Sequence, residues 1–275
     1  MHFLQRGKPA CRGRFIVPTA DLSASGTSIT YPDECVKLHY RPGNSITYLN
    51  RFVKVQIMSQ HSANITGPHQ GQPLLLAGEP LESARAAMIM IHGRGATAQD
   101  ILTLTTELPV PGFAYLAPQA AGNTWYPNSF LAPIPSNEPG LSSGLAVIAS
   151  ILDQLAKASI PAERTIILGF SQGACLTLEY VARNARPYGG VVGLSGGLIG
   201  PDGTPRDYPG SLAGTPVFLG CSDIDPHVPK ERVEQSAEVL QRLGGNVTAR
   251  LYPRMGHTVN RDELRFVQTM MVALT

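Results

Sequence analysis

Residues 164–184 read RTIILGFSQGACLTLEYVARN, and this stretch decides the fold. Its apolar first part, 164–169, predicts a buried strand, and 172–184 predicts a helix. The turn between them, Gly169-Phe170-Ser171-Gln172-Gly173, fits the pattern Gly-x-Ser-x-Gly. After a strand and before a helix, this pattern presents a serine hydroxyl at a sharp turn. Only small residues fit at the position two before the serine and at the position two after it. The alternative is a serine that merely caps the helix.

Short apolar runs alternate with helical patterns on both sides of this turn. The other strands are predicted at residues 46–57, 74–77, 87–91, 113–117, 190–194, 216–220 and 247–251. The other helices are predicted at residues 97–108, 141–158, 230–243 and 261–273. Continuous apolar strands between amphipathic helices are typical of an α/β fold, with a mostly parallel sheet covered by helices on both faces. Reactive groups then lie beyond the carboxyl ends of the strands.

A serine hydroxyl becomes a useful nucleophile only when a base takes its proton. In a fold with this turn, the chain order is Ser, then acid, then His. Only two of the seven histidines, His227 and His257, follow Ser171. His227 shares a loop with the acid candidates, whereas His257 follows the last predicted strand, so we predict His257 as the general base.

The acid is expected in the loop after the strand at 216–220, which reads CSDIDPHVP over residues 221–229. Asp223 and Asp225 both lie there, and position in the loop alone does not separate them. For the oxyanion, the backbone N–H of Gln172 is one expected donor. The N–H of Arg94, in the His92-Gly93-Arg94-Gly95 loop, is the other. The Arg94 guanidinium either meets an anionic substrate or lies exposed.

The long loop at residues 118–139 is expected to supply the apolar pocket wall through Trp125, Tyr126 and Phe130, although core packing is an equal alternative for Trp125. Only residues 195–215 lie between the strands at 190–194 and 216–220, too few for a helical cap, which predicts an open site with a minimal lid. Cys175 and Cys221 also lie near the site. A cysteine nucleophile is disfavoured because the elbow position holds a serine.

These pieces together resemble the bacterial carboxylesterase/phospholipase family of α/β-hydrolases, which includes acyl-protein thioesterases. The matching segments are His92-Gly93-Arg94-Gly95, Ala117-Pro118, Trp125-Tyr126, Gly169–Ala174, Asp225–Pro229 and Met255-Gly256-His257. The family's Asp-x-x-Val-Pro motif implies Asp225, not Asp223, as the acid. The resemblance also implies Ser171 and His257 as the other members of a catalytic triad. Many relatives carry an apolar residue where Arg94 stands.

The resemblance implies a serine carboxylesterase that hydrolyses short to medium acyl esters through an acyl-enzyme. A lysophospholipase, an acyl-protein thioesterase-type hydrolase and a peptidase are alternatives on the same triad. A hydrolase-fold protein that binds a ligand without turnover is an alternative of another class, and a missing triad member would be its usual sign. The proposed chemistry requires no cofactor and no metal.

Composition excludes several classes of protein. The chain has 275 residues, 43% of them hydrophobic and 15% charged, which is typical of a globular protein. Its formal net charge of +2 gives no reason to expect nucleic-acid binding. No apolar run approaches the ~20 residues of a membrane span, and no signal-peptide core is visible. We therefore expect a cytoplasmic enzyme with a small-molecule ester substrate and no stable membrane insertion, either monomeric or homodimeric. The four cysteines are interpreted as reduced thiols.

The charge is distributed unevenly along the chain. Residues 1–57 hold eight Lys or Arg against three Asp or Glu, whereas residues 58–275 hold 14 against 17. Family members usually begin shortly before the first strand, and a chain that started at Met58 would have a typical family length. We therefore expect residues 58–275 to form the α/β-hydrolase domain. Residues 1–57 are interpreted as an N-terminal extension, either non-native or disordered.

Overall fold

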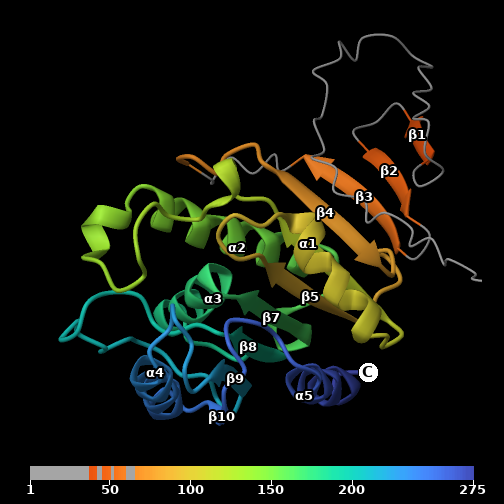
Figure 1. Ribbon diagram of the computed structural model, residues 1–275. Helices are drawn as coiled ribbons and strands as arrows, with labels where there is room; N and C mark the ends of the chain where they lie inside the picture. The colour runs from red at the N-terminus through yellow and green to blue at the C-terminus, as the bar shows by residue number, and fades with distance from the viewer. Residues whose placement is uncertain (1–36, 42–44, 51–52, 60–65) are drawn as a thin grey trace, which may run out of the picture.

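A central sheet organises the chain in the computed structural model, which describes residues 37–41, 45–50, 53–59 and 66–275 (Figure 1). Within these residues the sheet has ten strands, in the order β1-β2-β3-β4-β6-β5-β7-β8-β9-β10. Strands β5 to β10 run parallel to their neighbours, and β4 pairs antiparallel with β6. The mostly parallel α/β-hydrolase sheet expected from the sequence is confirmed for β4 to β10.

The elements alternate along the chain as the apolar pattern predicts. The strands are β1 Lys37–Arg41, β2 Ser45–Asn50, β3 Val53–Ser59, β4 Pro73–Gly78, β5 Ala86–Ile91, β6 Phe113–Pro118, β7 Thr165–Phe170, β8 Gly190–Leu194, β9 Pro216–Ser222 and β10 Asn246–Tyr252. The α-helices are α1 Ala98–Leu102, α2 Gly140–Lys157, α3 Gln172–Arg183, α4 Lys230–Arg242 and α5 Arg261–Val272. Short 3₁₀ turns are η1 Thr103–Glu107, η2 Ala121–Asn123, η3 Ile134–Asn137 and η4 Ala162–Arg164.

Helices cover both faces of the sheet, as Figure 1 shows. The side chains of β5 alternate between two cores: Ile89 and Ile91 join the core beneath α2, α3 and α4, whereas Met88 and Met90 join the core beneath α1 and α5. All six residues of β5 are buried. Full burial of one large aliphatic side chain contributes roughly 1.5–3 kcal/mol, so this central strand anchors the loop that follows it.

The expected helix at 97–108 is shorter in the structure. It begins at an N-cap formed by Thr97, whose side chain and backbone N–H form a reciprocal capping box with Asp100, and it continues only to Leu102. Thr103–Glu107 then forms a 3₁₀ turn. Hydroxyl groups of Thr103 and Thr105 donate to the carbonyls of Asp100 and Leu102 at 2.6 and 2.7 Å, an interaction that competes with a regular α-helix.

The domain boundary predicted at Met58 falls inside β3, which pairs with β4 from Gln56 to Ser59. Residues 1–36, the first part of the predicted extension, lie outside the described residues. The single division at Met58 therefore stays a prediction. Across the described part of the chain, no helix is both long and apolar enough to cross a bilayer.

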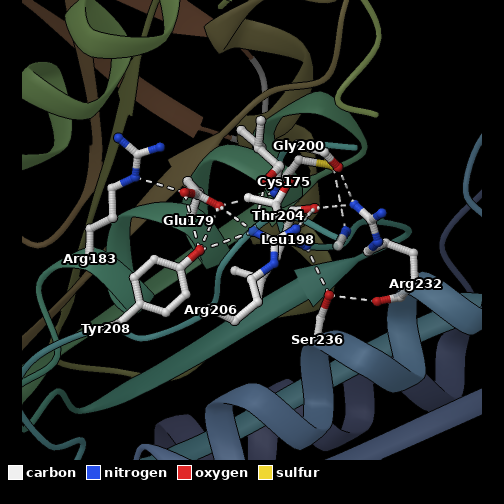
Figure 2. A network of polar contacts seen from close by, with 12 residues as sticks. Cys175, Glu179, Arg183, Leu198, Gly200, Thr204, Arg206, Tyr208, Arg232 and Ser236 are labelled. Carbon is white, nitrogen blue, oxygen red and sulfur yellow. Dashed lines mark hydrogen bonds and ion pairs between the residues drawn. The ribbon is translucent and has the colours of Figure 1, made fainter. Parts of the chain in front are cut away.

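Residues 195–215 contain no helix and so form no helical cap, as expected. Buried charges hold this loop to α3 and α4, and Figure 2 shows Glu179 at the centre of their network. The Glu179 carboxylate accepts from Arg183 Nε at 2.7 Å and from the Ile199 N–H at 3.0 Å. Arg232 of α4 donates to the Leu198 carbonyl at 2.9 Å. The Gly200 N–H in turn donates to the Phe130 carbonyl at 2.7 Å, which ties the loop to the predicted pocket wall.

Candidate active site

Ser171 stands at the sharp turn between β7 and α3. Its φ of 55° and ψ of −119° lie in a region that a residue with a side chain rarely adopts. The two flanking glycines make the turn possible: a Cβ on Gly169 would collide with the Gly173 backbone, and a Cβ on Gly173 would collide with the Ile91 carbonyl. The Gly-x-Ser-x-Gly pattern therefore folds as predicted, and it presents the Ser171 hydroxyl beyond the end of β7.

The three residues predicted as a triad form one hydrogen-bonded relay. Ser171 Oγ lies 2.8 Å from His257 Nε2. His257 Nδ1 lies 2.7 Å from Asp225 Oδ2. A carboxylate only accepts, so Nδ1 carries the proton and Nε2 is free to accept one from the serine. The loop after β9 and the loop after β10 bring these groups together from residues far apart in the chain.

The Asp225 carboxylate is buried and fully engaged, with 0% side-chain exposure. Its Oδ1 accepts from the backbone N–H groups of His227 and Val228 at 2.8 and 3.1 Å. Burial alone raises the pKa of this carboxyl, but the hydrogen bonds from His257 and the two N–H groups outweigh it and leave the pKa below its usual value. Asp225 is therefore ionised at neutral pH and holds the tautomer of His257.

Asp223, the second carboxylate of the same loop, takes no part in this relay. Its Oδ1 accepts from the Arg254 N–H at 2.8 Å, and the residue is exposed. It therefore joins the two loops that carry Asp225 and His257. The geometry favours Asp225 over Asp223 as the acid.

Two rings flank His257. The Phe170 ring centroid lies 5.1 Å from the imidazole, and the His227 ring lies 4.8 Å away in an edge-on arrangement. His227 was not expected as the base. Its backbone N–H binds Asp225, and its ring lies beside the His257 imidazole, a contact that the sequence did not predict. No spacing rule would have revealed this contact, because it depends on how two loops pack.

The two expected oxyanion donors lie next to Ser171. Gln172 follows Ser171 directly, and the loop after β5 passes close by: a Cβ on Gly93 would lie 3.3 Å from Ser171 Cβ. Within residues 66–275, neither the Arg94 nor the Gln172 backbone N–H donates a hydrogen bond. Free N–H groups beside a nucleophile can accept a developing negative charge.

The Arg94 guanidinium follows one of the two expected alternatives, but it is also held in place. It is exposed, yet it is fixed by hydrogen bonds to the segment from Thr124 to Asn128, including the Asn128 carbonyl at 2.6 Å and the Tyr126 carbonyl at 2.9 Å. These hydrogen bonds could not be predicted from the sequence, because every residue has a backbone carbonyl and a residue pattern does not show which one lies near Arg94.

A cavity of about 430 Å³ opens above Ser171 and His257. Its lining combines apolar and polar side chains: Arg94, Tyr126, Pro127, Asn128, Ser129, Phe130, Ser171, Gln172, Cys175, His227, Val228 and His257. Tyr126 and Phe130, expected in the pocket wall, both line the cavity. Trp125 does not line the cavity. It is fully buried, its Nε1 donates to the His92 carbonyl at 2.9 Å, and its ring packs against His69 and His92.

The two thiols near the site stay protonated. Burial raises the pKa of Cys175 and of Cys221 to about 12. Cys175 lines the cavity, and Cys221 Sγ lies 3.8 Å from Asp225 Oδ2 as a weak donor. A protonated, buried thiol is a poor nucleophile, so the site favours Ser171. In residues 66–275, no cluster of three or more His, Cys, Asp or Glu side chains is arranged to hold a metal ion.

Comparison with known proteins agrees with this geometry. A model of the phospholipase/carboxylesterase family matches residues 78–274. The solved structure of a phospholipase/carboxylesterase from Dyadobacter fermentans is 42% identical, covers 76% of this chain and 100% of that one, and superposes with a TM-score of 0.72. Acyl-protein thioesterase 1 of Debaryomyces hansenii is 28% identical over 70% of this chain and 92% of its own length. SOBER1 of Arabidopsis thaliana, at 22% identity and a TM-score of 0.59 over 70% of this chain and 99% of that one, shares the fold.

Proposed function

The chain belongs to the phospholipase/carboxylesterase family of serine hydrolases, and on that premise we propose that it hydrolyses short to medium acyl esters through a covalent acyl-enzyme on Ser171. The observation that carries this proposal is the relay at the floor of the cavity. Ser171 Oγ is 2.8 Å from His257 Nε2, and His257 Nδ1 is 2.7 Å from Asp225 Oδ2. Nucleophile, base and acid thus stand within hydrogen-bond reach of one another in the order that acyl transfer needs.

In the acylation step, Ser171 Oγ attacks the ester carbonyl carbon while its proton moves to His257 Nε2. The carbonyl π pair moves onto oxygen, and the Arg94 and Gln172 N–H groups stabilise that oxyanion. As the oxygen pair returns, the bond to the alcohol breaks and His257 gives its proton to the leaving oxygen. The ionised Asp225 stabilises the transient imidazolium throughout.

Deacylation repeats these steps with water as the nucleophile. His257 Nε2 takes a proton from a water molecule that attacks the acyl carbon, and the same two N–H groups bind the second oxyanion. His257 then returns the proton to Ser171 Oγ as the acid is released. The base has no need to change its place, since both attacking oxygens approach the same carbonyl carbon.

The cavity supports acyl chains of limited length. A volume of about 430 Å³ lies in the lower part of the range for small-molecule sites. Tyr126, Phe130 and Val228 supply apolar wall, and the loop at 195–215 adds no helical cap over it. A site without a cap leaves one side wet, so each further methylene beyond the apolar wall gains little free energy from burial.

A thioesterase is the second candidate, favoured by a specific likeness. The similarity to acyl-protein thioesterase 1 of Debaryomyces hansenii extends over 92% of the length of that protein. The same relay would cleave a thioester, since the thiolate is a better leaving group than an alkoxide. A lysophospholipase remains a third candidate, because its ester bond would react in the same way.

A substrate panel tests the proposal. Purified protein is assayed with p-nitrophenyl esters from acetate to palmitate, a lysophosphatidylcholine and an S-acyl thioester, with Ser171→Ala as the matched control. We expect the highest kcat/KM at short to medium acyl length, and loss of turnover in Ser171→Ala. A maximum at the longest chains, or a strong preference for the thioester or the lysophospholipid, would replace the proposed substrate class. No hydrolysis of any of them would favour the ligand-binding alternative.

A further inference from the structure

The segment Thr124–Asn128, which we name the bridging segment, connects the loop after β5 to the N-terminus of α3, which carry the two oxyanion donors. Arg94 reaches it from the loop after β5. Its Nη1 donates to Thr124 Oγ1 at 3.1 Å and to the Pro127 carbonyl at 2.9 Å. Its Nη2 donates to the carbonyls of Tyr126 and Asn128 at 2.9 and 2.6 Å. One guanidinium therefore makes four hydrogen bonds to a five-residue segment.

Gln172 reaches the same segment from the N-terminus of α3. Its Oε1 accepts from the Trp125 N–H at 2.9 Å, and its Nε2 donates to the Tyr126 carbonyl at 2.8 Å. The Tyr126 carbonyl thus accepts from both Arg94 and Gln172, and the Thr124 hydroxyl, at 3.0 Å, is a third donor to it. The two side chains converge on one oxygen.

The contacts of Arg94 are with neutral groups. Within residues 66–275, no carboxylate lies within 4.0 Å of its guanidinium. A planar fork with fixed donor directions suits several carbonyls arranged around it, and a lysine, with one ammonium, cannot reach four of them in the same geometry. The arrangement therefore depends on the shape of the guanidinium.

We propose that Arg94 and Gln172 act as positioning residues for the oxyanion hole through their side chains. Each residue offers its backbone N–H to the oxyanion and fixes its own position by holding the bridging segment. The Gly95 N–H donates to the carbonyl of Asn123 at 2.7 Å, which adds a contact between the loop after β5 and the residue just before the bridging segment. The bridging segment thus sets the distance between the two N–H groups, and it also forms part of the pocket wall.

This proposal rests on the proposed function, since an oxyanion hole matters only if Ser171 attacks a carbonyl. It predicts a specific kinetic signature. Arg94→Met leaves the backbone N–H in place but releases the bridging segment. A donor displaced by about 1 Å from the oxyanion can cost ~10²-fold in rate, so kcat should fall by about 10–100-fold. The N–H groups bind the oxyanion most strongly in the transition state, so KM should change less than kcat, by no more than about threefold.

The single tryptophan provides a readout that needs no turnover. Trp125 lies inside the bridging segment and is the one tryptophan of the chain, so tryptophan emission reports on this segment alone. It is fully buried. In Arg94→Met we expect a red shift of the emission and at least about a twofold rise in acrylamide quenching, because a buried indole becomes exposed to water. Arg242→Met, an exposed arginine of α4, is the matched control and should change neither emission nor kcat.

Arg94→Lys separates shape from charge. Lysine keeps the positive charge beside the oxyanion but loses the fork, so it should recover less than about a third of the kcat lost in Arg94→Met. If Arg94→Lys restores full kcat, charge carries the effect and the positioning proposal is wrong. It is also overturned if Arg94→Met leaves both kcat and tryptophan quenching at wild-type values.

Gln172 supplies an independent arm. Gln172→Met keeps its backbone N–H and loses its side-chain contacts with Thr124, Trp125 and Tyr126, so it should also lower kcat more than it changes KM. Because both side chains hold the Tyr126 carbonyl, the two substitutions combined should cost less than the product of their separate effects. If the loss of kcat in the double variant equals the product of the two single losses, Arg94 and Gln172 act independently. That result would overturn their shared role in positioning the bridging segment. If the wild type hydrolyses no ester at all, the proposed function fails, and the tryptophan measurements still decide whether Arg94 holds the segment.

Discussion

Replacing Asp225 by asparagine changes one oxygen of the carboxylate to an amide nitrogen and leaves the shape of the side chain unchanged. The two oxygens of Asp225 have different partners: Oδ2 accepts from His257 Nδ1 at 2.7 Å, and Oδ1 accepts from the His227 and Val228 N–H groups at 2.8 and 3.1 Å. An asparagine has one acceptor oxygen, so it can satisfy only one of these sides.

The preferred orientation of that amide determines the outcome. If its oxygen keeps the two backbone N–H bonds, its NH₂ group faces His257 Nδ1, which must then accept. The imidazole proton moves to Nε2, which donates towards Ser171 and cannot take the serine proton. The opposite orientation keeps the useful tautomer but opposes an NH₂ group to two N–H donors, at a loss of about 1 kcal/mol per bond. The unproductive tautomer therefore prevails.

The expected loss is large. We expect kcat to fall by about 10⁴-fold, the magnitude known for the loss of the correct tautomer in serine hydrolases. That factor corresponds to about 5.4 kcal/mol of transition-state stabilisation. Because the amide fits the space of the carboxylate, the fold should persist, and circular dichroism should match that of the wild type.

The assay compares kcat for p-nitrophenyl butyrate in Asp225→Asn and in Asp223→Asn, with equal amounts of folded protein. Asp223 is exposed and binds the Arg254 N–H, so its substitution should change kcat by no more than about threefold. Retention of more than about a tenth of kcat in Asp225→Asn would refute the tautomer argument. A larger loss in Asp223→Asn than in Asp225→Asn would reverse the assignment of the acid.

Two further predictions concern stability and buried titratable groups. Burial raises the pKa of Glu263 to about 7, so the folded state holds a proton that the unfolded chain releases near pH 4.5; the free energy of unfolding should fall with rising pH across this window, by on the order of 3 kcal/mol. Urea unfolding at pH 5 and pH 8 should show this fall in the free energy of unfolding in the wild type and in the exposed control Glu234→Gln, but a much smaller fall in Glu263→Gln. An equal fall in all three proteins would contradict the role of Glu263. Burial also lowers the pKa of His69 and of His92, whose rings accept the Ala121 and Ala120 N–H groups at 3.1 Å. The neutral rings therefore contribute fully to the free energy of unfolding above about pH 6.5, and this contribution is lost as the pH falls below that value. Tryptophan emission should therefore shift to the red on acidification before far-ultraviolet circular dichroism changes, and coincident transitions would argue against local loosening.

The sequence predicted most of the sheet and its helices because the apolar runs of a parallel sheet are long and continuous. The strand at 87–91 and the turn around Ser171 are such cases: full burial and steric exclusion leave few alternatives at these positions. One segment was divided wrongly. The apolar stretch at 46–57, expected as one strand, forms β2 and β3, paired antiparallel.

The residues of the relay were predictable because chain order and motif restrict them, whereas their surroundings were not. Trp125 was expected in the pocket or the core in equal measure, and it lies in the core because its Nε1 binds the His92 carbonyl. The hydrogen bonds from Arg94 to the bridging segment could not be predicted, because acceptors such as the Tyr126 and Asn128 carbonyls are backbone groups that any sequence provides. Contacts to the backbone across distant loops depend on packing, which a residue pattern does not record.

The central claim, that Ser171 is a nucleophile activated by His257, is tested most directly by covalent labelling. The protein is treated with a fluorophosphonate, and intact mass with peptide mapping locates the adduct. We predict one adduct per chain on Ser171, with no adduct in Ser171→Ala and much slower labelling in His257→Ala. Absence of an adduct in the folded wild-type protein, or an adduct on another residue that persists in Ser171→Ala, would contradict the claim.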